Sequence, residues 1–130
     1  MRFDIITIFP HIFNSYLNES ILKRAQKRGL IKIKIHNLRD FAKDKHKKVD
    51  NKPFGGGPGM VLKLEPLVKA VSSLKLKVKS SKSKVILFSP TGKQFDNKTA
   101  AKLAKNYKNL ILICGRYEGI DARIERIIKN

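Results

Sequence analysis

The sequence predicts an α/β protein: a mostly parallel β-sheet with helices on both of its faces. Two observations predict this fold class. Short runs of apolar, β-branched residues alternate along the chain with segments of helical spacing, which is the order expected of strands connected by helices. Apolar residues make up 42% of the 130 residues, so one domain with one core needs no disulfide to fold.

The first half of the chain opens as a strand, a helix and a second strand. Pro10 ends the first apolar run, and the helix that follows has capping residues at 18–20 and Gly29 at its end. No periodicity appears in the segment that ends at Met60, and a loop of that length is usually functional or mobile. The predicted elements are a buried strand over 3–9, a helix over 21–28, a strand near the sheet edge over 31–35, a loop over 37–60 and a helix over 64–73.

The second half resumes the alternation after an ambiguous stretch. Between residues 72 and 84, leucine and valine alternate with lysine before a Ser/Lys tract. This pattern allows a marginal strand, and we favour an exposed connector. Either Asp96 or Asn97 caps the next helix. The remaining predicted elements are a buried strand over 85–88, a helix that follows the cap, a buried strand over 110–114 and a helix over 122–129 that Asp121 caps.

The charge of the chain points to an anionic partner. Its 29 Lys and Arg against 10 Asp and Glu give a formal net charge of +19, which opposes compaction unless an anion relieves the repulsion. Nucleic acid is the first candidate. The alternative is a general lysine-rich composition that spreads over any solvated face.

Cysteine content and hydropathy bear on the compartment. The lone Cys114 cannot support a disulfide framework. No apolar segment at the start of the chain is long enough for a signal peptide or a membrane span. We therefore expect a cytoplasmic protein without a membrane partner.

Two glycine-containing turns follow buried strands directly. They are "FSPTG" after the strand at 85–88 and "GRYEGID" after the strand at 110–114. Ligands of open α/β sheets bind outside the carboxyl ends of the strands. At Gly115 and Gly119 the backbone can approach a ligand closely and read an adenine edge or a ribose, while Glu118 accepts hydrogen bonds. The alternative is that both are ordinary turns in which glycine supplies a positive φ.

Familiar nucleotide and metal motifs do not match. The two glycines of "GRYEG" do not make a G-x-G-x-x-G fingerprint, and "PTGKQ" lacks parts of a phosphate loop, which disfavours a nicotinamide or ATP enzyme. Asp44 and His46 are two residues apart in a lysine-rich loop, where a solvated face is the simpler interpretation, so no metal is expected. No nucleophile with a neighbouring base is visible.

The "KPFGGGPGM" loop allows two interpretations. Its glycines can let the backbone pass against a planar group, with His46 and nearby lysines on phosphates and Asp50 accepting from a base edge. Alternatively, the glycines simply make a mobile loop.

Several stretches together resemble the bacterial tRNA (guanine-N1)-methyltransferases. The resemblance covers essentially the whole chain and rests on "DIITIFP", "SILKRAQKRGLIKI", "LRDFAKDKHKKVDNKPFGGGPGMVLK", "ILFSPTGK" and "LILICGRYEGID". It implies a SPOUT-type fold, in which a parallel sheet carries a deep trefoil knot. It implies methyl transfer from S-adenosylmethionine to N1 of the guanosine 3′ of the anticodon (position 37) in tRNA, next to a preceding guanosine that is also read. It also implies a homodimer with each active site between subunits.

The resemblance also assigns roles to residues. Arg116 and Glu118 would support catalysis. The cofactor pocket would be formed by Leu87, Phe88, Ser89, Pro90, Gly115, Tyr117, Glu118 and Gly119. The residues near the RNA would be His46, Asp50, Gly55, Gly56, Gly57 and Gly59.

The sequence departs from the family pattern at its end. Family members continue with a glycine-rich third cofactor loop, which completes the knot, and with a C-terminal domain that supplies an aspartate as general base. The sequence at hand stops at Asn130, so we expect residues 1–130 to be a truncated methyltransferase domain with an incomplete knot. The alternatives are a catalytically inert, basic RNA-binding remnant and a half that needs a separate C-terminal chain.

Overall fold

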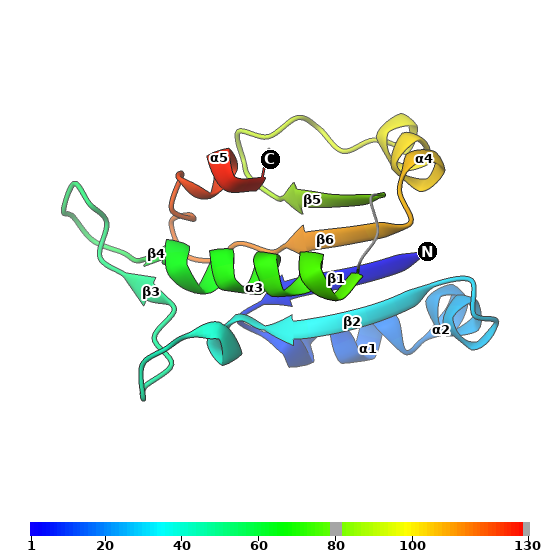
Figure 1. Cartoon of the computed structure of the whole chain (residues 1–130), viewed down its shortest axis with the longest axis horizontal. Coiled ribbons are helices and arrows are strands. Elements are labelled where there is room, and N and C mark those ends of the chain that lie inside the picture. The colour runs from blue at the N-terminus through cyan, green and yellow to red at the C-terminus, as the bar shows by residue number, and fades with distance from the viewer. Residues whose placement is uncertain (79–81, 129–130) are drawn as a thin grey trace.

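Four parallel strands form one sheet in the order β2-β1-β6-β5 in the computed structural model, which describes residues 1–78 and 82–128 (Figure 1). The central strands are largely buried, and the outer strand β2 alternates between exposed and partly buried residues over 32–35, as its sequence predicted. The strands are β1 (Arg2–Thr7), β2 (Lys32–Asn37), β5 (Ser83–Leu87) and β6 (Asn109–Ile113). The predicted parallel sheet is therefore confirmed.

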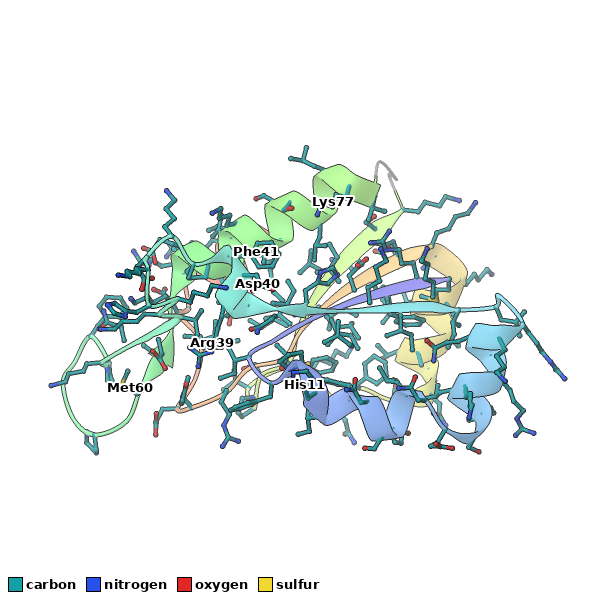
Figure 2. All side chains as sticks on the ribbon, turned by 90° about the horizontal axis from the view of Figure 1, so that it is seen from below. His11, Arg39, Asp40, Phe41, Met60 and Lys77 are labelled. Atoms are coloured by element: carbon teal, nitrogen blue, oxygen red, sulfur yellow. The ribbon has the colours of Figure 1, made fainter. Side chains whose placement is uncertain are left out.

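Helices cover both faces of the sheet. Helix α3 (Leu64–Val78) lies along one face, and Figure 2 shows α1, α2 and α4 on the other. Asp96 caps α4, because its carboxylate accepts from the backbone N–H of Thr99 at 2.7 Å. The side-chain cap predicted for α2 is absent at its N-cap residue, Glu19. The bounds on this face are η1 (Pro10–Phe13), α1 (Asn14–Leu17), α2 (Ser20–Lys27) and α4 (Asn97–Asn106).

The exposed connector predicted over 72–84 is wrong at both ends, because α3 continues to Val78 and β5 already begins at Ser83. Its buried residues Leu67, Ala70, Val71 and Leu74 recur at helical spacing and pack against Ile6, Ile111 and Ile113 of the sheet. Leu74 also fits the alternation of leucine with lysine, so the pattern did not indicate that the apolar face of the helix continues beyond residue 73. Residues 79–81, which the same prediction included, lie outside the described residues.

The long loop predicted over 37–60 is anchored at two buried residues. Leu38 begins the short helix η2 (Leu38–Phe41), and both Leu38 and Val49 belong to the core. The strands β3 (Asp50–Asn51) and β4 (Val61–Leu62) then pair antiparallel. The glycine-rich segment is thus the tip of a hairpin that projects from the carboxyl edge of the sheet (Figure 1).

The last described helix is shorter than predicted. A turn occupies residues 122–123, and α5 (Ile124–Ile128) follows, with Ile124 buried in the core. The Asp121 carboxylate accepts from the Arg123 backbone N–H at 3.0 Å, so it stabilises this turn. Residue 129 of the predicted helix lies outside the described part of the chain. Among the helices of residues 1–78 and 82–128, none has the length and apolar character that a membrane crossing requires.

Candidate functional site

The two predicted turns meet at the carboxyl ends of the neighbouring strands β5 and β6. Their ladder ends where the Phe88 N–H donates to the Ile113 carbonyl at 3.3 Å. Between the described residues no further backbone bond joins the two segments, which leaves the Phe88 carbonyl and the Gly115 N–H available. A Cβ on Gly115 would lie 3.2 Å from Ile120 Cδ1 and 3.8 Å from the Phe88 carbonyl oxygen. The absence of a side chain at Gly115 therefore keeps this edge open.

The "SPTG" turn is closed by its own first residue. The Ser89 carbonyl accepts from the Gly92 N–H at 3.0 Å, and the hydroxyls of Ser89 and Thr91 are 3.0 Å apart. Ser89 therefore fixes the turn that carries Pro90. Leu87 is half-buried at the end of β5, and 46% of the Phe88 side chain is exposed, so an apolar surface borders the open backbone groups.

Glu118 joins the "GRYEG" turn to the glycine-rich hairpin. Its carboxylate accepts from the Met60 N–H at 2.6 Å, and its own N–H donates to the Met60 carbonyl at 3.2 Å. A Cβ on Gly59, where φ is +95°, would overlap this carboxylate. On the other side of the contact, the Leu62 N–H donates to the Gly119 carbonyl at 3.1 Å. Two segments that are about sixty residues apart in sequence thus form one unit.

Tyr117 makes a second contact between these loops. It has a left-handed backbone, with φ of +63°, and a hydrogen bond to the Asp50 carboxylate raises the pKa of its hydroxyl. Arg39, which follows β2, interacts with the same hydroxyl. Our sequence analysis did not single out Arg39. Arg39 follows β2 at the same carboxyl edge of the sheet as the two turns, and this position was a signal that could have identified it.

Arg116 points to the end of β1. Its guanidinium lies 5.4 Å from the centre of the Phe9 ring, a cation–π distance. Phe9 was also absent from the predicted site. Cys114, which precedes the turn, is partly buried, and this burial raises the pKa of its thiol. The free thiol is therefore protonated over the neutral range.

Other predicted RNA residues lie outside this cluster. His46 is exposed in a turn where the Asp44 carboxylate accepts from the Lys48 N–H at 3.1 Å. Residues 55–57 are exposed at the tip of the hairpin. Within the described part of the chain, neither His46 nor residues 55–57 form a hydrogen bond or an ion pair with the two turns. The described residues also contain no cluster of three His, Cys, Asp or Glu side chains that could hold a metal ion.

Comparisons with known proteins agree with this architecture. Residues 1–130 match the family model described as tRNA (Guanine-1)-methyltransferase TrmD. The chain is 55% identical over 128 residues to a tRNA (guanine-N(1)-)-methyltransferase of Dictyoglomus turgidum, and 52% identical over 129 residues to that of Thermomicrobium roseum. These alignments cover 98% and 99% of the chain but 50% and 47% of the relatives. The chain thus spans about half the length of the curated relatives it matches.

A solved structure shares the fold. The crystal structure of tRNA (m1G37) methyltransferase from Aquifex aeolicus is 38% identical and superposes with a TM-score of 0.87. The match covers 100% of this chain and 57% of that one. It confirms the predicted SPOUT-type sheet with helices.

Proposed function

The chain belongs to the tRNA (guanine-1)-methyltransferase family, and we propose that the protein transfers a methyl group from S-adenosylmethionine to N1 of guanosine 37 in tRNA, in the cytoplasm. The observation that carries this proposal is the convergence of three segments at one sheet edge. The "FSPTG" turn, the "GRYEG" turn and the glycine-rich hairpin meet where ligands of α/β sheets bind.

The open end of the β5–β6 ladder fits the proposed cofactor. An adenine edge offers one donor and neighbouring acceptors, which match the free Phe88 carbonyl and Gly115 N–H. Leu87, Phe88 and Pro90 supply apolar surface for the adenine ring. The two turns that contain Ser89, Tyr117, Glu118 and Gly119 hold the surrounding backbone in place. When bound, S-adenosylmethionine supplies an electrophilic methyl group on a sulfonium centre.

The residues of this chain contribute positioning. An in-line displacement requires the guanine N1 and the methyl carbon to be held at near contact distance. Holding them in this geometry lowers the activation barrier by several kcal/mol. Glu118 fixes the hairpin against the cofactor turn through Met60, and exposed Arg116 offers a cation to the RNA. The Glu118 carboxylate accepts from the Met60 N–H, and the Asp50 carboxylate interacts with the Tyr117 hydroxyl, so we assign neither as the base that removes the N1 proton. We propose an aspartate outside residues 1–130 for that step.

The positive charge and the hairpin support a tRNA partner. A net charge of +19 favours phosphate contacts, and Gly55, Gly56, Gly57 and Gly59 expose backbone beside Asp50 and near His46. Phosphate contacts release counterions, so the affinity for tRNA should fall steeply as salt rises. An affinity that is unchanged between low and moderate salt would contradict this part of the proposal.

A methylation assay tests the proposed function. The purified protein is incubated with labelled S-adenosylmethionine and a tRNA that carries guanosine at position 37. The product is mapped by primer extension, because a methyl group at N1 blocks base pairing and stops the polymerase. We expect a stop at position 37 and none with an adenosine-37 tRNA. RNA binding without any methyl transfer would instead favour the inert RNA-binding remnant.

We also propose that the protein forms a homodimer. The accessible surface is 9306 Å², whereas a compact monomer of 14.8 kDa exposes roughly 7000 Å². Part of the excess is apolar, because Tyr16 and Ile21 in the α1–α2 layer are 73% and 70% exposed. Light scattering should give twice the monomer mass, and Tyr16→Glu should lower it. The control is Leu76→Glu, which changes an equally exposed side chain on α3.

A further inference from the structure

A cleft of about 520 Å³ lies at the amino edge of the sheet, where β1, β2 and β6 begin. We call it the amino-edge cleft. Figure 1 shows the N-terminus at this edge and the β3–β4 hairpin at the other end of the sheet. These strands are five or six residues long, so the cleft is about 17–20 Å from the proposed cofactor edge. Its lining includes Met1, Arg2, Gly29, Lys32, Tyr107 and Lys108.

Backbone hydrogen bonds hold the cationic residues of this cleft in place. The Met1 ammonium donates to the Leu30 carbonyl at 2.9 Å, so this end of the chain is anchored, although chain ends commonly fray. The Lys32 N–H donates to the Met1 carbonyl at 2.9 Å. The Arg2 N–H donates to the Lys108 carbonyl at 2.9 Å. Cationic residues from three separate parts of the sequence therefore have fixed backbone positions around one cleft.

Three of these cations have no anionic partner. Among the described residues, the ammonium groups of Met1, Lys32 and Lys108 form no ion pair. The described lining contains no Asp or Glu, and neither do the bordering segments 20–39 and 97–117. The cleft thus gathers three positive charges, and an anion bound between them would relieve their mutual repulsion.

The ends of the neighbouring helices do not account for these charges. Lysines in the last turn of a helix balance the partial negative charge of its free carbonyls, and Lys27 and Lys105 hold such positions in α2 and α4. Met1 directly precedes β1, Lys32 begins β2 and Lys108 directly precedes β6, so all three lie outside both helices. A bound anion gives these three charges a common role.

The cleft also offers hydrogen-bond donors to an anion. An ammonium has three N–H donors, and Met1 uses one of them on Leu30, which leaves two. Arg2 binds the buried Asp4 carboxylate through Nε and Nη2, so both donors of its Nη1 remain. A phosphate group combines negative charge with several acceptor oxygens, and it therefore matches a site of cations and donors without carboxylates.

We propose that the amino-edge cleft binds a phosphate group, with Met1, Lys32 and Lys108 as its cations. The site does not depend on the proposed methyl transfer, because it lies at the other end of the sheet and none of its lining residues belongs to the two turns. The phosphate has two possible sources: the backbone of a bound RNA, and a free phosphorylated small molecule. Both present the same oxygen atoms to the cleft.

A nuclear magnetic resonance titration locates the site. The isotope-labelled protein is titrated with sodium pyrophosphate at constant ionic strength, and the backbone amide shifts are followed. We expect saturable shifts at the amides of Arg2, Lys32 and Lys108, which border the cleft. Shifts of equal size at lysines over the whole surface would show attraction to the net charge alone, and this result would overturn the proposal.

Two charge-matched double variants test the cations. Lys32→Gln with Lys108→Gln removes two charges from the cleft, and Lys69→Gln with Lys98→Gln removes two exposed charges of α3 and α4 outside the lining. Each pair removes two charges, so the net charge falls from +19 to +17 in both. The cleft pair should weaken pyrophosphate binding about 3- to 30-fold, and the control pair less than about 2-fold. Equal weakening by the two pairs would refute the site.

A third variant moves a charge without removing one. A Gly-Ser extension before Met1 carries the terminal ammonium away from the cleft and leaves the net charge unchanged. We expect it to weaken pyrophosphate binding about 2- to 5-fold. Unchanged affinity would contradict the role of the Met1 ammonium. Thermal unfolding identifies variants that have lost their fold, and the extension keeps the proposal testable if the cleft pair does not fold.

The same variants distinguish the two sources of phosphate. Affinity for tRNA is measured by fluorescence anisotropy at the same ionic strength. If the RNA backbone occupies the cleft, the cleft pair weakens tRNA binding about 3- to 30-fold and the control pair less than about 2-fold. If the ligand is a free phosphorylated molecule, the two pairs differ for pyrophosphate and are equal for tRNA. Equality for both probes overturns the proposal, whereas absence of methyl transfer in the same preparation bears on the proposed function alone.

Discussion

Replacing Gly59 by alanine should break the contact between the hairpin and the "GRYEG" turn, and Gly57 offers a matched control. The two glycines have nearly the same backbone, with φ of +95° and +94°. A Cβ on Gly59 would overlap the Glu118 carboxylate, whereas a Cβ on Gly57 would have no atom within 4 Å. The backbone strain of roughly 1–2 kcal/mol is therefore common to both variants, and only Gly59→Ala displaces Glu118.

The expected difference follows from the bonds that Glu118 makes. Displacing its carboxylate removes the 2.6 Å bond from the Met60 N–H and loosens the 3.2 Å bond to the Met60 carbonyl. At an exposed position each of these is worth about 0.5–1 kcal/mol net. Gly59→Ala should thus lower the free energy of opening this contact by about 1–2 kcal/mol more than Gly57→Ala does. This corresponds to about a 5- to 30-fold larger population of the open state.

Hydrogen exchange of the Met60 amide measures this equilibrium without requiring activity. We expect exchange to be about 5- to 30-fold faster in Gly59→Ala than in Gly57→Ala. In a Glu118→Ala background the two alanine substitutions should become equal, because the carboxylate that distinguishes them is gone. Equal exchange rates in the two single variants would refute the reasoning.

Three further predictions concern the proposed cofactor edge, a buried carboxylate and the core. Gly115→Val should abolish calorimetric binding of S-adenosylmethionine, whereas Gly55→Val, which has open space around its Cβ, should bind like the wild type; unimpaired binding by Gly115→Val would mean that the pocket is misplaced. Burial raises the pKa of Asp4, but its bonds with Arg2 and His36 outweigh this effect, so the pKa of the folded state is lowered. The stability that Asp4 confers is therefore present above its unfolded pKa, near 4, and is lost as the pH falls through the lower folded pKa. Asp4→Asn should lower the free energy of unfolding by on the order of 2 kcal/mol at neutral pH, and the variant should lose less stability than the wild type as the pH falls below 4. An unchanged loss of stability at acid pH would contradict the role given to Asp4. Leu74→Ala should lower the free energy of unfolding by about 2–5 kcal/mol in denaturant titrations, and a loss below 1 kcal/mol would contradict its place in the core.

Much of the sheet was predictable because its signals are local. An apolar run such as 110–114 predicts a buried strand from its own residues, and the alternation over 31–35 predicts an edge. The neighbouring positions of the "FSPTG" and "GRYEGID" turns followed from the expectation of parallel strands. The end of α3 was mispredicted, because Leu74 fits a period of two as well as a period of 3.6.

The sequence by itself determined the parallel α/β class, the two turns at the strand ends and the excess of positive charge, since composition and periodicity are properties of neighbouring residues. Only the tertiary structure decided that Glu118 bonds to the backbone of Met60, that Tyr117 meets Asp50 and Arg39, and that Arg116 lies over the ring of Phe9. The physical reason is that these partners come from different strand ends. The strand order β2-β1-β6-β5 brings their loops to one edge, and no spacing along the chain encodes which loops will meet.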